Sequence, residues 1–141
     1  METTVIAIVS SESLYRLAWL INQQVELNLS EAEQIKIMHQ QRKEIHSFFV
    51  FSHTDKNQKL RYSLIQNKSE HGPLVPSLKQ IDYFFRIDSE TSFATSDVMA
   101  KLKHIKEIQL SQIVDAKNLK KGEPIFSINL FYNIKDGFGP F

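Results

Sequence analysis

Apolar side chains recur along this chain of 141 residues with two different periods. Leu14, Leu17 and Ile21 are three to four residues apart, which predicts an amphipathic helix over residues 12–24, and the same spacing predicts a second helix over 95–106. Most other apolar segments alternate every second residue or are short and β-branched, as is typical of strands. We therefore expect strands at residues 3–9, 45–52, 60–66, 81–88, 108–114 and 125–134.

Residues 25–43 carry conflicting signals. Ser30 is followed three residues later by Glu33, which fits a capping box and favours a helix. Ile35 and Ile37 alternate with polar neighbours, which favours a strand. We predict a helical turn followed by a short strand.

The order of these elements predicts an α+β fold, specifically an elaborated ferredoxin-like sandwich with a mostly antiparallel sheet and the two main helices on one face. The composition agrees with one ordered domain, because 42% of the residues are hydrophobic and 23% are charged. We place this single domain at residues 1–134 and a C-terminal tail at 135–141. The formal net charge of +1 excludes a strongly basic, general DNA-packaging protein.

The sequence excludes several kinds of chemistry. Because it contains no cysteine, it excludes disulfides, iron–sulfur clusters, thiolate zinc sites and cysteine nucleophiles. It also lacks a P-loop, a GxGxxG motif and a GxSxG motif. Among the five histidines, His39, His46 and His53 are seven residues apart, but a strand at 45–52 would not bring them to one site. We expect no metal site, no cofactor and no enzymatic activity.

The sequence also carries no membrane or export signal that we can identify. No apolar run approaches the ~20 residues of a membrane-spanning helix. The short apolar run at residues 5–9 has no basic residue before it, unlike a signal peptide. We expect a cytoplasmic protein that does not bind membranes.

Three segments of the chain carry a family resemblance. Residues 15–22 read YRLAWLIN and residues 74–83 read LVPSLKQIDY, while Ile108, Val114 and Asp115 keep the register of a third motif. Together they resemble the IPExxxVDY family of small bacterial proteins, found chiefly in Bacteroidetes. The Pro, Glu and Tyr of the name-giving motif are replaced here by Gln109, Leu110 and Ala116. The resemblance covers about residues 3–126 and implies kinship without implying an activity.

The first of these segments contains candidate binding residues. Tyr15 and Trp19 are one helical turn apart beside the apolar stripe, so they either widen the buried face or form an aromatic contact patch for a partner. Arg16 lies away from that stripe, and we expect a carboxylate or backbone carbonyls to hold it. Asp82, in the second segment, is a further candidate for binding.

The C-terminal apolar segment suggests self-association. Residues 125–134 are amphipathic, rich in rings and extend past the family-like region. A strand there either docks on its own sheet or pairs with a second copy, since an exposed edge invites another chain. Pairing would bury Phe126, Phe131 and Tyr132 at a two-fold interface, and we predict a homodimer.

An aromatic strand and a group of lysines offer an alternative function. Residues 47–51 read SFFVF, similar to the strand whose exposed rings stack on bases in RNA-recognition sheets, and residues 101–121 contain six lysines. The function predicted from the sequence is therefore a non-enzymatic interaction or regulatory module that self-associates. The alternative is an RNA-binding domain.

Overall fold

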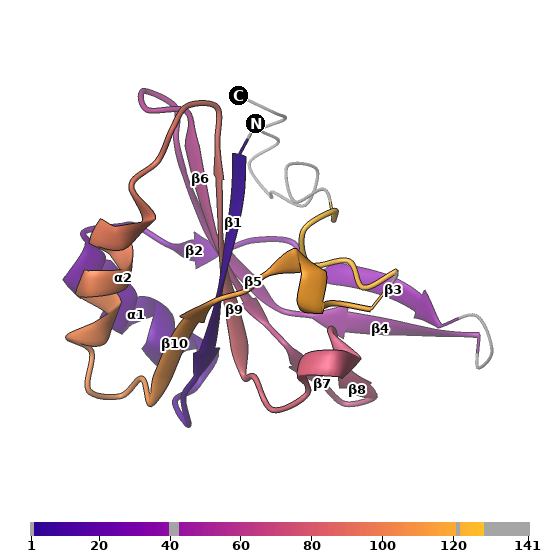
Figure 1. The fold of residues 1–141 in the computed structure, drawn as a ribbon. Coiled ribbons are helices and arrows are strands. Elements are labelled where there is room, and N and C mark those ends of the chain that lie inside the picture. The colour runs from indigo at the N-terminus through magenta and orange to yellow at the C-terminus, as the bar shows by residue number, and fades with distance from the viewer. Residues whose placement is uncertain (1, 40–42, 121, 129–141) are drawn as a thin grey trace.

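A six-stranded antiparallel sheet forms the centre of the computed structural model, which describes residues 2–39, 43–120 and 122–128 (Figure 1). The strand order is β10-β1-β9-β6-β5-β2, and every neighbouring pair is antiparallel. The strands are β1 (Glu2–Val9), β2 (Ser30–Glu31), β5 (Val50–Asp55), β6 (Leu60–Gln66), β9 (Tyr83–Ser89) and β10 (Leu110–Ile113). The predicted α+β class with an antiparallel sheet is confirmed.

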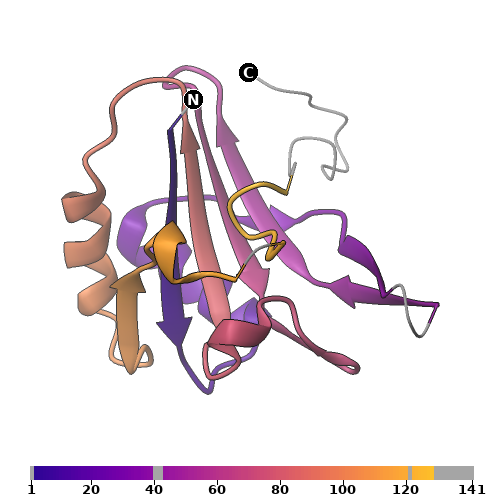
Figure 2. The same ribbon diagram turned by 45° about the vertical axis from the view of Figure 1, so that its right-hand side comes forward.

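Both helices, α1 (Leu14–Val25) and α2 (Thr95–Lys103), pack on the same face of this sheet, as predicted (Figures 1 and 2). Their apolar stripes share one core with inward-facing strand residues. Leu17 of α1 and Leu102 of α2 are fully buried there, together with Phe85 of β9. The spacing of three to four residues thus places one side of each helix against alternate residues of the strands.

Residue-specific contacts set the two ends of α1. The Ser13 hydroxyl accepts a hydrogen bond from the Arg16 backbone N–H at 3.2 Å and so caps the first turn. Glu26 has φ of 62°, and this left-handed residue ends the helix. The Asn22 side chain, inside α1, forms hydrogen bonds with both the N–H and the carbonyl of Leu29, which follows the helix. These bonds turn the chain back toward the sheet.

The opposite face of the sheet is covered by strands and irregular segments. Two hairpins, β3 (Ile35–His39) with β4 (Glu44–Phe48) and β7 (Lys68–Ser69) with β8 (Gly72–Pro73), extend from it, together with 3₁₀ turns η1 (Pro76–Leu78) and η2 (Ala116–Asn118). A second core forms here around Val5, Phe48, Ile65, Phe84 and Ile125. In Figure 1 these segments lie on the right of the sheet and the helices lie on the left.

Residues 25–43 differ from the prediction. The short strand at 35–39 is present, but Ser30 and Glu31 form strand β2 in place of the expected helical turn. Ser30 pairs with Ser52 and Glu31 with Phe51, so backbone hydrogen bonds to β5 override the local capping pattern. The expected strand at 45–52 is also divided, into β4 and β5, at Phe49.

The prediction of a strand at residues 125–134 is wrong for residues 125–128, the part that the structure describes. Residues 125–127 form a turn, in which the Pro124 carbonyl accepts hydrogen bonds from the N–H groups of Ser127 and Ile128. Residues 129–134 of that prediction, and the tail at 135–141, lie outside the described residues.

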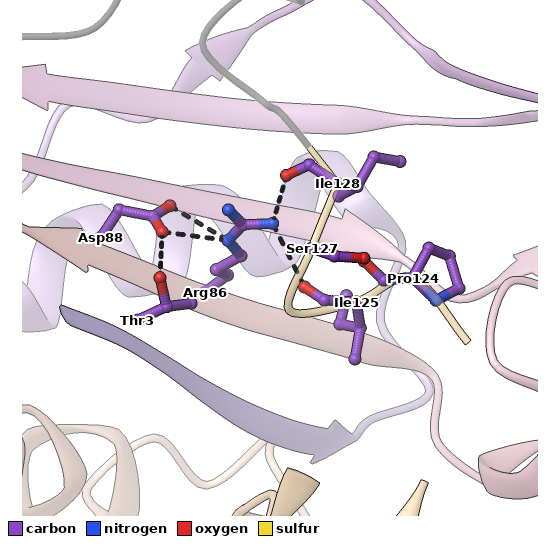
Figure 3. Close-up of polar contacts among 7 residues, drawn as sticks. All are labelled: Thr3, Arg86, Asp88, Pro124, Ile125, Ser127 and Ile128. Atoms are coloured by element: carbon purple, nitrogen blue, oxygen red, sulfur yellow. Dashed lines mark hydrogen bonds and ion pairs between the residues drawn. The ribbon is translucent and has the colours of Figure 1, made fainter. Parts of the chain in front are cut away.

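Arg86 joins this turn to the sheet (Figure 3). Its Nη1 donates to the carbonyls of Ile125 and Ile128, at 3.2 and 2.6 Å. Its Nε donates to both carboxylate oxygens of Asp88, at 3.1 and 3.2 Å, and the Thr3 hydroxyl donates to the same carboxylate at 2.7 Å. The side chains of Arg86 and Asp88 are only 5% and 0% exposed, so this ion pair is held out of water.

A second polar contact holds the same C-terminal segment. The Glu123 carboxylate accepts hydrogen bonds from the backbone N–H and hydroxyl of Ser77 in η1 and from the N–H of Lys120. Partial burial raises the pKa of Glu123, but these hydrogen bonds outweigh burial and lower its pKa below the ordinary value. The charged form of Glu123 therefore favours the folded state.

Replacing Arg86 by Met should strongly destabilise the fold. Arg86→Met removes the charge that compensates buried Asp88 and leaves two carbonyls without their donor. We expect the free energy of unfolding, measured by urea denaturation, to fall by about 3 kcal/mol or more. Arg16→Met, at a half-exposed arginine, is the matched control and should change it by less than about 0.5 kcal/mol. Equal losses of unfolding free energy in the two variants would contradict the stabilising role of Arg86.

Replacing Glu123 by Gln should weaken the acid dependence of stability. Because its folded pKa is lowered, the contribution of Glu123 is fully present above the unfolded value of about 4.3 and is lost as the pH falls through the folded pKa. At neutral pH the free energy of unfolding of wild type should exceed that of Glu123→Gln by no more than about 1 kcal/mol. Urea unfolding at a series of pH values should show this gap closing on acidification. Glu33→Gln, at an exposed glutamate, serves as the control, and a gap that widens in acid would refute the linkage.

Candidate interaction surface

The outward side of α1 carries three large side chains at its N-terminal half. Tyr15 is 70% exposed, Trp19 is 52% exposed, and the Arg16 side chain is half-exposed between them. The opposite side of the same turns is buried through Leu14 and Leu17. Of the two interpretations open from the sequence, the structure places Tyr15 and Trp19 outside the buried face. We call Tyr15, Arg16 and Trp19 the α1 surface.

Contacts with neighbouring groups arrange the α1 surface. The Arg16 guanidinium lies over the Trp19 ring, 5.0 Å from its centroid, in a cation–π contact. Arg16 also forms an ion pair with Glu107 at 3.8 Å, which supplies the carboxylate partner expected from the sequence. Tyr15 and Phe51 of β5 form a T-shaped ring contact with centroids 5.0 Å apart. The α1 surface therefore combines two exposed rings with one positive charge, and the largely buried carboxylate of Glu107 lies beside it.

Asp82 lies apart from the α1 surface and anchors the loop that leads into α1. One carboxylate oxygen accepts the Ser10 backbone N–H at 2.9 Å, and the other pairs with Lys68 at 2.7 Å. The next residue, Tyr83, donates its hydroxyl to the Glu12 carbonyl at 2.6 Å. Burial, followed by the nearby charges of Asp82 and Glu12, raises the pKa of Tyr83 and keeps this donor protonated.

A buried asparagine organises the second family-like segment. Asn67 is fully buried, and its side chain donates to the carbonyls of Leu78 and Ile81 and accepts the Val75 N–H. Its backbone bonds to Leu74 and Asp82. Residues 74–82 are thus folded around one amide side chain, and Asp82 and Tyr83 then contact the loop before α1. Residues 74–83 are therefore tied to the loop that leads into the first family-like segment.

The phenylalanines of the proposed RNA-binding strand are mostly in the core. Phe48 is 1% exposed and Phe51 is 7% exposed, whereas Phe49 is 48% exposed. Two of the three rings are therefore not available to stack on bases. Of the described lysines in this group, Lys101 and Lys103 lie on the last turn of α2.

The candidate self-association residues are only partly described. Phe126 is half-buried and packs against the second core, which includes Ile125. Arg86 binds the carbonyls on both sides of it, at Ile125 and Ile128. The described end of this segment therefore docks on its own sheet. Phe131 and Tyr132 lie outside the described residues.

The structure brings together one group of residues that the sequence did not indicate. His46 and His71 stack with ring centroids 4.9 Å apart, and Glu44 lies beside both. By contrast, His53 accepts a hydrogen bond from the Asn28 N–H near Tyr62. The alternation of Glu44 and His46 on one strand was a signal for the group, but nothing local placed His71 next to them.

Two hollows lie outside the α1 surface. One, of about 480 Å³, is bordered by β4 and the β7–β8 turn and includes Phe49, Lys68 and His71. The other, of about 570 Å³, lies between the β5–β6 turn and the start of α2. Tyr62 lines the second, and its pKa is raised by burial and then by the charge of Asp55.

Comparisons with known proteins add no assignment. No family model, no curated protein and no solved structure matches the chain. Within residues 2–39, 43–120 and 122–128, no helix has the length and apolar character needed to cross a bilayer.

Proposed function

We propose that this protein is a non-enzymatic interaction module that binds a second copy of itself through the α1 surface. The observation that carries the proposal is the joint exposure of Tyr15, Arg16 and Trp19 on one side of a well-anchored helix. Trp, Tyr and Arg are the residue types that most often dominate binding energy at protein interfaces. Rigid rings of this kind also lose little conformational entropy on binding.

The charges beside the rings favour a second copy as the partner. Arg16 and Glu107 carry opposite charges and are 3.8 Å apart. At a two-fold interface, each Arg16 can face the Glu107 of the other copy, because such an interface uses the same surface twice. The low net charge of +1 adds little repulsion between copies.

A sheet edge offers another route to the same assembly. Within the described residues, β10 pairs with β1 and lies at the end of the sheet, and its Leu110 and Ile113 are exposed. Pairing of two β10 strands would extend the sheet across a two-fold axis. The strand has only four residues, so it offers fewer backbone bonds than a longer edge.

The RNA-binding alternative has weaker support. Exposed Phe49 and the lysines near the end of α2 favour it, whereas the burial of Phe48 and Phe51 removes most of its stacking surface. We therefore retain the interaction module as the proposed function.

We further infer an elaborated ferredoxin-like topology. The elements β1, α1, β6, β9, α2 and β10 follow the β-α-β-β-α-β order of that fold. In support, β1 and β6 run in the same direction with β9 between them, and β9 and β10 do so with β1 between them. Segments β2 to β5 are then an insertion after α1. Membership of the IPExxxVDY family and a cytoplasmic location belong to the same proposal.

Removing the two exposed rings should dissociate the dimer. In sedimentation velocity over a range of micromolar concentrations, wild type should show a monomer–dimer equilibrium. The double variant Tyr15→Ala/Trp19→Ala should weaken dimerisation by about thirtyfold or more. Its thermal unfolding should change little, because both rings are exposed.

Two further variants make this test specific. Phe49→Ala removes an exposed ring outside the α1 surface and should leave dimerisation unchanged. A wild type that stays monomeric throughout would refute self-association. A dimer that is lost in Ile113→Lys and kept in Tyr15→Ala/Trp19→Ala would place the interface at β10 and refute the role of the α1 surface.

A further inference from the structure

Strand β4 presents, on one face, two side chains of types that can bind metal ions. Glu44 and His46 are two residues apart, and side chains at this spacing point to the same side of a strand. The strand is held by β3, with Glu44 opposite His39 and His46 opposite Ile37. The His46 side chain is only 12% exposed, so its position is defined by packing. Two potential ligands are therefore placed by regular backbone structure.

The third side chain comes from the turn of the neighbouring β7–β8 hairpin. His71 lies in this turn, between Ser69 and Gly72. The Ser69 hydroxyl donates to the Gly72 carbonyl at 2.7 Å and accepts the His71 N–H at 3.2 Å. Gly72 has φ of 125°, a backbone conformation that residues with a side chain rarely adopt. The turn therefore has a defined shape that directs His71 toward β4.

The three side chains converge on one point. The Glu44 carboxylate oxygen Oε2 is 3.4 Å from His46 Nε2 and 3.5 Å from His71 Nδ1. All three potential ligand atoms lie within 4.8 Å of one another. Two ligands of a tetrahedral zinc ion, with bonds of about 2.0–2.1 Å, are about 3.3 Å apart. Both contacts made by Glu44 thus have the separation that a shared metal ion requires.

The chemistry of this ligand set selects a class of ion. Imidazole nitrogens favour zinc and its transition-metal neighbours, whereas calcium and magnesium prefer oxygen ligands alone. Two histidines and one glutamate are also a known ligand set for zinc with an open fourth position. Glu44 and His71 are each 40% exposed, so water can reach that position.

We propose that Glu44, His46 and His71 bind one divalent transition-metal ion, with zinc as the ion whose common ligand set they match. His46 binds through Nε2 and His71 through Nδ1, and one carboxylate oxygen of Glu44 lies between them. The ion joins the β3–β4 hairpin to the β7–β8 hairpin, two elements that contact each other directly through β4 and β7.

Calorimetry with the untagged full chain and Zn²⁺ tests the site. Wild type should bind one Zn²⁺ ion per chain with a measurable binding enthalpy. Co²⁺ should bind at the same site and give the visible absorption of a low-symmetry complex with nitrogen and oxygen ligands. Zn²⁺ should also raise the melting temperature, since it binds the folded site.

Three variants test the ligands one at a time, and a fourth is their control. His71→Ala, His46→Ala and Glu44→Gln should each weaken Zn²⁺ binding by at least about tenfold. His104→Ala removes an exposed histidine at the C-terminal end of α2 and should bind Zn²⁺ like wild type. Because His46 is packed, His71→Ala and Glu44→Gln decide the test if His46→Ala fails to fold.

Two results would overturn the proposal. One is Zn²⁺ binding that is as tight in His71→Ala and Glu44→Gln as in wild type. The other is a wild type with neither a binding enthalpy nor a rise in melting temperature on addition of Zn²⁺. In that case the three side chains form only a polar cluster that holds no metal ion.

Discussion

The buried ion pair between Arg86 and Asp88 determines how the second face of the sheet is closed. A guanidinium in an apolar interior is tolerated only if its charge and its N–H groups are satisfied. Asp88 satisfies the charge from the same strand, but the Nη1 group needs carbonyl acceptors from outside the sheet. The turn at Ile125–Ile128 supplies them, so a strand at this point would remove the partners that Arg86 requires.

Periodicity predicted the elements whose burial is one-sided. Leu14, Leu17 and Ile21 mark α1 because their spacing matches the helix, and both helices were placed correctly on one face. The errors fall where long-range contacts override a local pattern. Ser30 pairs with Ser52 of β5 despite its capping signal. At residues 125–128 the alternation was outweighed by hydrogen bonds from Arg86 to the backbone, which no pattern in that segment could reveal.

The candidate sites show the same limit of local information. Tyr15 and Trp19 flank the buried stripe, so their exposure depends on whether another element covers that side of α1, which only the tertiary arrangement decides. Glu44 and His46 could be grouped from strand alternation, but His71 joins them through a different hairpin. For Arg16 the sequence left an ordinary surface arginine as open as one held by a carboxylate, and the structure supplies Glu107 as the carboxylate.

The position of β1 has a consequence for how the chain reaches this fold. β1 lies between β9 and β10, so Ile6 pairs with Phe85 on one side and Ile113 on the other. Pairings so distant in sequence make folding slow, since large loops must close first. At a synthesis rate of about 5–20 residues per second, an apolar strand waits roughly 4–15 s for its first partner. During that interval the apolar side chains of Val5, Ile6 and Ile8 lack their strand partners, so the rate of translation sets how long they are open to association with other chains.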